Sequence, residues 1–141
     1  MTDTTIEIKG LDKVIKKMDK IGDKDDFRKA TREAVLYVQG RVPPYPPPPP
    51  TSTYVQTGQL GRSITSLQGE HPNALSRVGE LGGDIVGIIG TNLEYAPYVI
   101  DKERQAYMHK GRWYTLQDVV TKASEGIRKV YEAMINRWLN A

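Results

Sequence analysis

The chain has 141 residues, no cysteine and a net charge of +3, with 20 Lys and Arg against 17 Asp and Glu. This length fits one domain with a modest core, and the lack of cysteine excludes disulfides and thiolate metal sites. The small basic excess is interleaved with acids, which weighs against dedicated nucleic-acid recognition. No apolar run is long enough to cross a bilayer, and we expect no secretory signal, so the expected site of synthesis is a reducing cytoplasm, away from membranes.

The first part of the chain is predicted to contain one strand and two helices. Residues Thr4 to Ile8 alternate polar and apolar side chains, which is typical of a short strand. Apolar residues at three- and four-residue steps from Leu11 to Ile21 indicate an amphipathic helix, and Gly22 stands where it would stop. The acids of Asp23 to Asp26 suit the positive end of a second helix, whose apolar face continues to Val42. The two helices therefore predict a hairpin with one buried side.

A proline-rich segment interrupts the fold at residues 43–57. Pro43 ends the second helix, and the residues up to Pro50 are almost all proline, so they lack backbone donors and favour polyproline II. We expect an exposed loop within a single domain that spans residues 1–141. Polyproline II also fits SH3- and WW-type grooves, so an adaptor role for Pro46–Pro50 is an alternative to a stiff loop.

Beyond the proline segment the hydrophobic period changes to two. Arg62 to Gln68, Ala74 to Leu81 and Asp84 to Gly90 are each predicted to form a strand, and the last is rich enough in Ile and Val to be buried. Gly82-Gly83 suits a two-residue hairpin turn, because glycine accepts the positive φ that such turns require. The connections are too short for crossover helices, so we expect an antiparallel sheet.

The end of the chain carries the clearest helical pattern. Thr115 and Asp118 resemble a capping box, with Asp in place of the usual Glu. Apolar residues keep helical spacing from Leu116 to Trp138, and Gly126 is where we expect a bend. The predicted fold class is α+β, with a small antiparallel sheet packed against an N-terminal helical hairpin and a long C-terminal helix.

The sequence contains no motif that indicates catalysis or metal binding. His71 and His109 are the only histidines, and no serine has the context of a nucleophile elbow. The acids of Asp23 to Asp26 lack the spacing of a calcium loop, and the glycines between Gly79 and Gly90 match no phosphate-binding pattern. We therefore expect a protein that is not an enzyme and that uses no cofactor or metal.

The stretch from Arg104 to Tyr114 mixes basic and aromatic side chains in a way that indicates a binding surface. Tyr, Trp and Arg are the usual anchors of protein interfaces, so a protein partner is the favoured interpretation. The same mixture can meet nucleic acid through phosphate contacts and base stacking. A small nucleic-acid-binding protein that uses Lys110, Arg112 and Trp113 is therefore the alternative, and the salt dependence of binding would separate the two.

Two motifs resemble those of a phage protein family. Thr57-Gly58-Gln59-Leu60-Gly61-Arg62-Ser63-Ile64 resembles the Thr-Gly-x-Leu-x-x-Ser-Ile signature of phage tail-completion and neck proteins. Gly90-Thr91-Asn92-Leu93-Glu94-Tyr95-Ala96-Pro97-Tyr98-Val99 is similar to the Gly-Thr-x-x-x-Tyr-Ala-x-x-Val segment of the same family.

Both motifs also have a physical interpretation. In the first, Thr57 can cap a short turn of helix that buries Leu60 and Ile64 and exposes Arg62. In the second, the chain leaves a strand through a rigid aromatic corner around Pro97. Packing of the core alone could therefore account for both motifs, and this interpretation is compatible with the family resemblance.

The resemblance implies a structural virion-assembly protein at the head–tail junction of a long-tailed bacteriophage. Such proteins are ring-forming subunits that contact the connector or adaptor on one side and tail-tube or tail-terminator proteins on the other. The implied assembly is a homo-oligomeric ring, built in the host bacterial cytoplasm, through whose lumen DNA passes without sequence recognition.

The chain departs from the family pattern after Ile100, where the basic and aromatic stretch replaces a short acidic, glycine-containing run. Loops of this kind make the specific contacts of a ring, so we expect the subunit or partner interface to lie here and in the preceding aromatic corner. The expected interface residues are Tyr95, Pro97, Tyr98, Arg104, Tyr107, His109, Lys110, Arg112, Trp113 and Tyr114.

Overall fold

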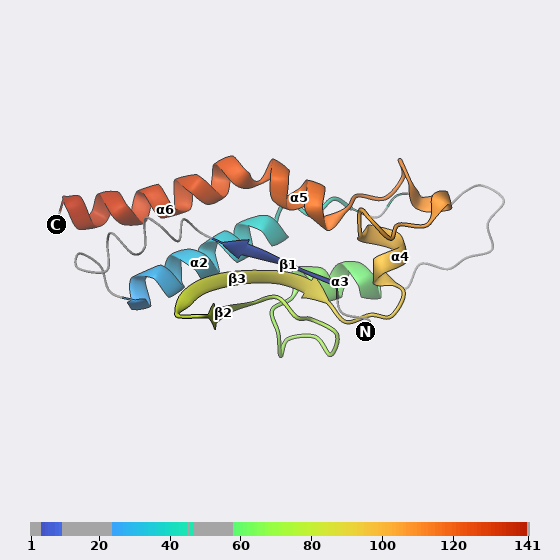
Figure 1. The fold of residues 1–141 in the computed structure, drawn as a ribbon, viewed down its shortest axis with the longest axis horizontal. Helices are drawn as coiled ribbons and strands as arrows, with labels where there is room; N and C mark the ends of the chain where they lie inside the picture. The colour runs from blue at the N-terminus through green and yellow to red at the C-terminus, as the bar shows by residue number, and fades with distance from the viewer. Residues whose placement is uncertain (1–3, 10–23, 45, 47–57, 141) are drawn as a thin grey trace.

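The structure is a computed structural model that describes residues 4–9, 24–44, 46 and 58–140 (Figure 1). Its elements, in chain order, are β1 (Thr4–Lys9), α2 (Lys24–Gln39), α3 (Gln59–Thr65), β2 (Arg77–Leu81), β3 (Asp84–Thr91), α4 (Ala96–Ile100), the 3-10 turn η1 (Tyr107–His109), α5 (Leu116–Lys122) and α6 (Ser124–Leu139).

The described strands form one antiparallel sheet in the order β1-β3-β2. Helix α2 packs on β3 and β2 and lies between the sheet and α6, which forms the outermost layer (Figure 1). The predicted α+β class is therefore confirmed. Of the predicted hairpin, the structure describes only the second helix, α2, because residues 11–21 lie outside the described part. Most of the predicted proline-rich loop at 43–57 lies outside it as well, although Pro43 and Pro44 are exposed.

The β2–β3 hairpin confirms the turn that the glycines predicted. Gly82 and Gly83 have φ values of 59° and 86°, in the left-handed region that glycine adopts without steric cost. Strand β2 begins at Arg77, three residues later than predicted, while Ala74 forms only an isolated bridge with Thr91.

The predicted strand at Arg62–Gln68 is wrong, because most of this segment belongs to helix α3. The helix enters through Gly58, whose φ is 78°, and buries Leu60 and Ile64 while Arg62 points outward. The alternative interpretation of the motif as a short helical turn is thus confirmed, although Thr57 itself lies outside the described residues. The side-chain amide of Gln39 donates to the carbonyls of Ile64 (2.9 Å) and Ser66 (3.0 Å), which have no intrahelical donor because they lie at the end of the helix.

The C-terminal helix is divided, but not at the predicted glycine. Thr115 caps α5, its hydroxyl accepting a hydrogen bond from the Asp118 amide at 3.2 Å. The helix is interrupted at Ala123, and α6 then continues through Gly126 without a break. Gly126 instead makes room for the Tyr37 ring, since a Cβ built on it would lie 2.1 Å from the ring's Cζ. The glycine is needed for close packing of α6 on α2, and the predicted bend there is wrong.

Helix α6 is held along α2 by paired side chains at several levels. The rings of Phe27 and Trp138 meet edge to face with centroids 5.1 Å apart, and the Trp138 indole donates to Asp26 at 2.9 Å. Further along, the hydroxyls of Thr31 and Tyr131 share a buried hydrogen bond of 2.6 Å. These contacts join residues about a hundred positions apart and close the helical layer of the domain.

Candidate interaction surface

The two family motifs meet inside the core. Ser63 of the first motif and Thr91 of the second are fully buried, and their hydroxyl oxygens lie 2.8 Å apart. Ser63 donates to the Leu60 carbonyl, so Thr91 donates to Ser63 and in turn accepts from the Leu93 amide. The motif hydroxyls thus fasten α3 to the end of β3, where the chain turns toward α4.

Helix α4 forms the aromatic corner that follows β3. Ala96 and Pro97 are buried in its first turn, where proline costs the helix no hydrogen bond. Tyr95 and Tyr98 flank this buried pair and expose 39% and 60% of their surface, respectively. The second motif therefore uses its small residues as the anchor and presents two tyrosines to solvent.

The segment from Asp101 to Thr115, which we call the recognition loop, is folded back on α4. The Ala106 amide donates to the Tyr98 carbonyl at 2.7 Å, and the Gln105 amide donates to that of Asp101, also at 2.7 Å. The Gln105 side chain donates to the carbonyls of Val99 (2.6 Å) and Trp113 (3.3 Å), so it ties both arms of the loop together. These bonds give the loop a defined shape despite its lack of long helices or strands.

The basic and aromatic residues of the loop divide into an outward and an inward group. Tyr107 and Met108 in η1 expose 92% and 68% of their surface. Trp113 and Tyr114 are half-buried and pack against the core, and the ring of Trp113 lies 6.3 Å from that of His109. The predicted site was drawn from residues that are close in sequence. In the structure some of them face solvent, while others pack against the core.

His109 belongs to the inward group. Its Nδ1 is buried and has no hydrogen-bond partner among the described residues. Burial lowers the pKa of His109 and the nearby charge of Arg112 lowers it further, so the imidazole is neutral at pH 7. His109 is partly buried beside Trp113, while Lys110 and Arg112 are exposed.

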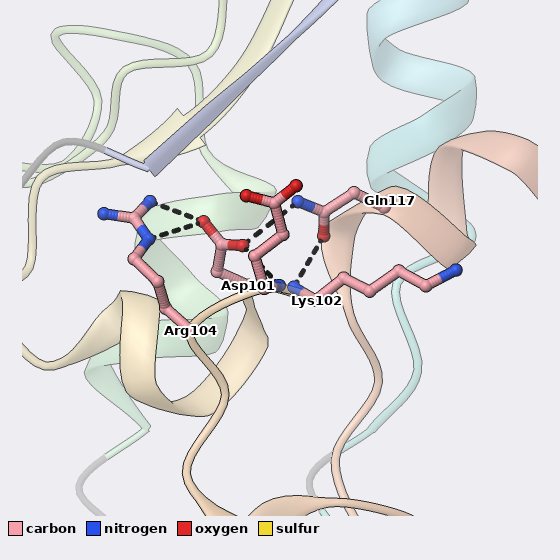
Figure 2. Close-up of polar contacts among 5 residues, drawn as sticks. Asp101, Lys102, Arg104 and Gln117 are labelled. Atoms are coloured by element: carbon pink, nitrogen blue, oxygen red, sulfur yellow. Dashed lines mark hydrogen bonds and ion pairs between the residues drawn. The ribbon is translucent and has the colours of Figure 1, made fainter.

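A buried carboxylate anchors the start of the recognition loop (Figure 2). Asp101 accepts hydrogen bonds from Arg104 Nε (2.9 Å), the Glu103 amide (3.0 Å) and the Gln117 side chain (3.4 Å). The Gln117 carbonyl oxygen accepts from the Lys102 amide at 3.1 Å, so the loop is also bound to α5. Arg104, a predicted interface residue, is thus engaged within its own loop, and Asp101 was not among the predicted site residues because its partners are set by the fold.

The charge on Asp101 is expected to make loop anchoring pH-dependent. Burial alone raises the pKa of Asp101, but the hydrogen bonds from Arg104 and the Glu103 amide outweigh it, and the net pKa is lowered from 3.8. A lowered folded pKa contributes stability that is present above the unfolded pKa and lost as the pH falls through the folded value. Asp101→Asn should therefore lower the free energy of unfolding at pH 7, and its difference from the wild type should shrink below about pH 4.

Denaturant unfolding of both proteins between pH 7 and pH 3 measures this difference. Glu103→Gln is the matched control, because its exposed side chain takes no part in the network while its amide still serves Asp101. A difference between the wild type and Asp101→Asn that stays constant across this range would show that the charge on Asp101 does not hold the loop.

The described residues offer little for other kinds of site. No three His, Asp or Glu side chains among residues 4–9, 24–44, 46 and 58–140 lie close enough together to hold a metal ion. In the same part of the chain, no helix has both the length and the apolar character needed to span a membrane.

Comparison with known proteins identifies the family. Residues 11–101, well over half of the chain, match the sequence profile of the HK97-gp10-like family, described as "Bacteriophage HK97-gp10, putative tail-component". Searches of the curated proteins and of the solved structures gave no match. The profile covers both motifs and the aromatic corner, and it ends at Asp101, where the recognition loop begins. The chain therefore belongs to the HK97-gp10-like family of bacteriophage tail components.

Proposed function

We propose that this chain is a ring-forming subunit of the neck, at the junction between head and tail of a long-tailed bacteriophage. It acts by binding and not by turnover, without a cofactor. Copies of the chain contact one another in the ring, which sits between the connector or adaptor and the tail-tube or tail-terminator proteins, and DNA passes through the lumen. Assembly takes place in the host bacterial cytoplasm. Family membership supports a structural role in the virion, and the position in the neck is our inference.

The observation that carries the proposal is a group of exposed anchors at one end of the molecule. Tyr95, Tyr98, Tyr107 and Met108 are exposed on the corner and the recognition loop. This end lies opposite the C-terminal end of α6 along the longest axis (Figure 1). Large side chains of this kind supply most of the binding energy in protein interfaces, and the loop beneath them is held in shape before binding.

The exposed anchors fit a heterologous contact of the kind that closes a ring. A loop at one end of an elongated subunit meets a different surface on its neighbour, and repetition of that contact generates rotational symmetry. Lys110 and Arg112, which follow η1 in the recognition loop, are exposed and form the polar rim of this surface. Charge at a rim contributes to specificity and association rate more than to affinity.

The structure weakens the nucleic-acid alternative. Of the three residues expected to contact nucleic acid, Trp113 packs against the core, so its ring is only partly available for stacking on a base. Lys110 and Arg112 are exposed and could meet phosphates, but within the stretch from Arg104 to Tyr114 Tyr107 is the aromatic side chain most open for stacking. A protein partner uses the exposed tyrosines and Met108 together, which makes it the better account.

Electron microscopy of lysates tests the position in the virion. A phage with a stop codon in place of Tyr37 should accumulate DNA-filled heads and separate tails. Expression of the intact chain from a plasmid in the same host should restore joined particles. Joined, infectious particles without that plasmid would contradict the neck assignment.

A further inference from the structure

A second surface, remote from the recognition loop in sequence, lies between helix α2 and the outer edge of strand β2. It is an open groove of about 450 Å³. Its floor is apolar and its walls are largely basic and polar. The lining residues are Arg28, Lys29, Arg32, Val35, Leu67, Gln68, Glu70, Ser76, Arg77 and Val78.

The cations of this groove are only partly neutralised. Arg28 pairs with Asp25 at 3.2 Å and with Glu80. Lys29 and Arg32, which lie on the same helix and are exposed, form no ion pair with any described residue. Glu70 is the one acid in the lining, so the groove carries an excess of positive charge that an acidic ligand would complement.

The groove also runs along the outer edge of β2, which pairs with no second strand of the described sheet. Strand β2 is at one edge of the described sheet, and the Gln68 amide donates to the Ser76 carbonyl on its outer side at 2.8 Å. Because backbone groups in a strand alternate in direction, those of Val78 and Glu80 also point outward. The segment at Leu67–Gln68 covers the edge only at Ser76, since its single parallel bridge there is followed by the turn at Gly69.

We infer that this groove binds an extended, acidic segment of a partner protein, which adds as a strand to the outer edge of β2. The backbone of the segment pairs with Val78 and Glu80, so it extends along β2 the pairing that Leu67–Gln68 makes at Ser76. Its acidic side chains face Lys29 and Arg32, and its alternate apolar side chains meet the partly buried Leu67 and Val78 on the groove floor. This site is separate from the recognition loop, so the inference does not depend on the proposed position in the neck.

A protein segment fits the groove better than nucleic acid does. A phosphate backbone would use Lys29 and Arg32 but would leave the apolar floor and the free strand edge without partners. An extended acidic peptide uses the charge, the floor and the edge together.

Fluorescence anisotropy with the full chain can test the inference with two probes. One is a labelled short peptide that alternates Glu with Val or Thr, and the other is a labelled short DNA duplex. The peptide should bind, and Lys29→Glu with Arg32→Glu should weaken its binding at least about tenfold. Lys129→Glu with Arg137→Glu is the matched control: these exposed α6 cations, far from the groove in sequence, also lack an ion pair with a described residue, and their reversal should leave the affinity unchanged.

A pair of variants at Glu80 tests strand pairing separately from charge. Glu80→Pro removes the outward amide and should weaken peptide binding at least about tenfold, whereas Glu80→Ala keeps the amide and should not weaken it. Both variants lose the ion pair with Arg28, so their comparison isolates the amide. Failure of the peptide to bind, equal binding by both Glu80 variants, or tighter binding of the DNA duplex would overturn the inference.

Discussion

Replacement of Tyr98 and Tyr107 by Ser is expected to abolish incorporation of the chain into virions while leaving its fold intact. The two tyrosines expose 60% and 92% of their surface, on α4 and on the tip of the recognition loop. Truncation of an aromatic anchor typically costs an interface about 2 kcal/mol or more, so the double variant should bind its neighbour roughly a thousandfold more weakly. Neither side chain packs in the core, so stability should change by less than about 0.5 kcal/mol per site.

The experiment complements the stop-codon phage with the double variant and measures infectious titre together with the amount of the chain in purified particles. Leu139→Ser is the matched control, because Leu139 is 65% exposed and is the last residue of α6, whose C-terminal end lies at the opposite end of the molecule (Figure 1). It removes a similar exposed apolar surface and should complement fully. Normal incorporation of the tyrosine variant, with the chain folded, would remove the recognition loop and the corner from the interface.

The choice of these two residues depends on what the structure adds to the sequence. The composition of the stretch from Arg104 to Tyr114 indicated a binding surface, but it could not separate outward from inward side chains. Trp113 contacts the core, so its replacement would disturb the fold as well as a partner, and Pro97 is buried in the first turn of α4. Met108 is not among the predicted site residues, although it lies in the same stretch and its exposure of 68% makes it part of the exposed surface of the recognition loop.

Local patterns predicted the elements whose causes are local. The Gly82-Gly83 turn, the strand after it and the cap at Thr115 follow from φ preferences, alternation and hydrogen bonding between near neighbours. The strand predicted at Arg62–Gln68 was wrong because the apolar residues of so short a segment can fit both the helical and the strand period. The spacing of Leu60 and Ile64 proved to be helical once Gly58 set the entry of the chain.

Features with distant causes could not be predicted in the same way. The network of Asp101 depends on Gln117, sixteen residues along the chain, and the groove depends on α2 lying beside β2. The role of Gly126 depends on Tyr37, which reaches it only through the crossing of α2 and α6. A glycine in a helical pattern indicates either a bend or a close approach, and the sequence alone does not say which.

That close approach makes the effect of Gly126→Ala depend on Tyr37. In an ordinary helix interior, alanine is favoured over glycine by about 1 kcal/mol. Here the added Cβ would lie 2.1–2.3 Å from three atoms of the Tyr37 ring, so the ring must leave or the helices must separate. Displacement of the ring also removes its packing on the core and the Arg41 guanidinium stacked 4.9 Å from its centroid. We expect Gly126→Ala to lower the free energy of unfolding by about 1–3 kcal/mol.

The sign of this effect should reverse when Tyr37 is removed. In the Tyr37→Ala background there is no ring for the new methyl group to displace, so Gly126→Ala should stabilise the chain by about 0.5–1 kcal/mol through helix propensity. Denaturant unfolding of the four variants gives the double-mutant cycle. Ala133→Gly, exposed on the same helix, is the control and should cost about 1 kcal/mol in both backgrounds. If Gly126→Ala stabilised the chain with Tyr37 present, the ring would not occupy the space that the glycine leaves, and the packing of α6 on α2 would have to be revised.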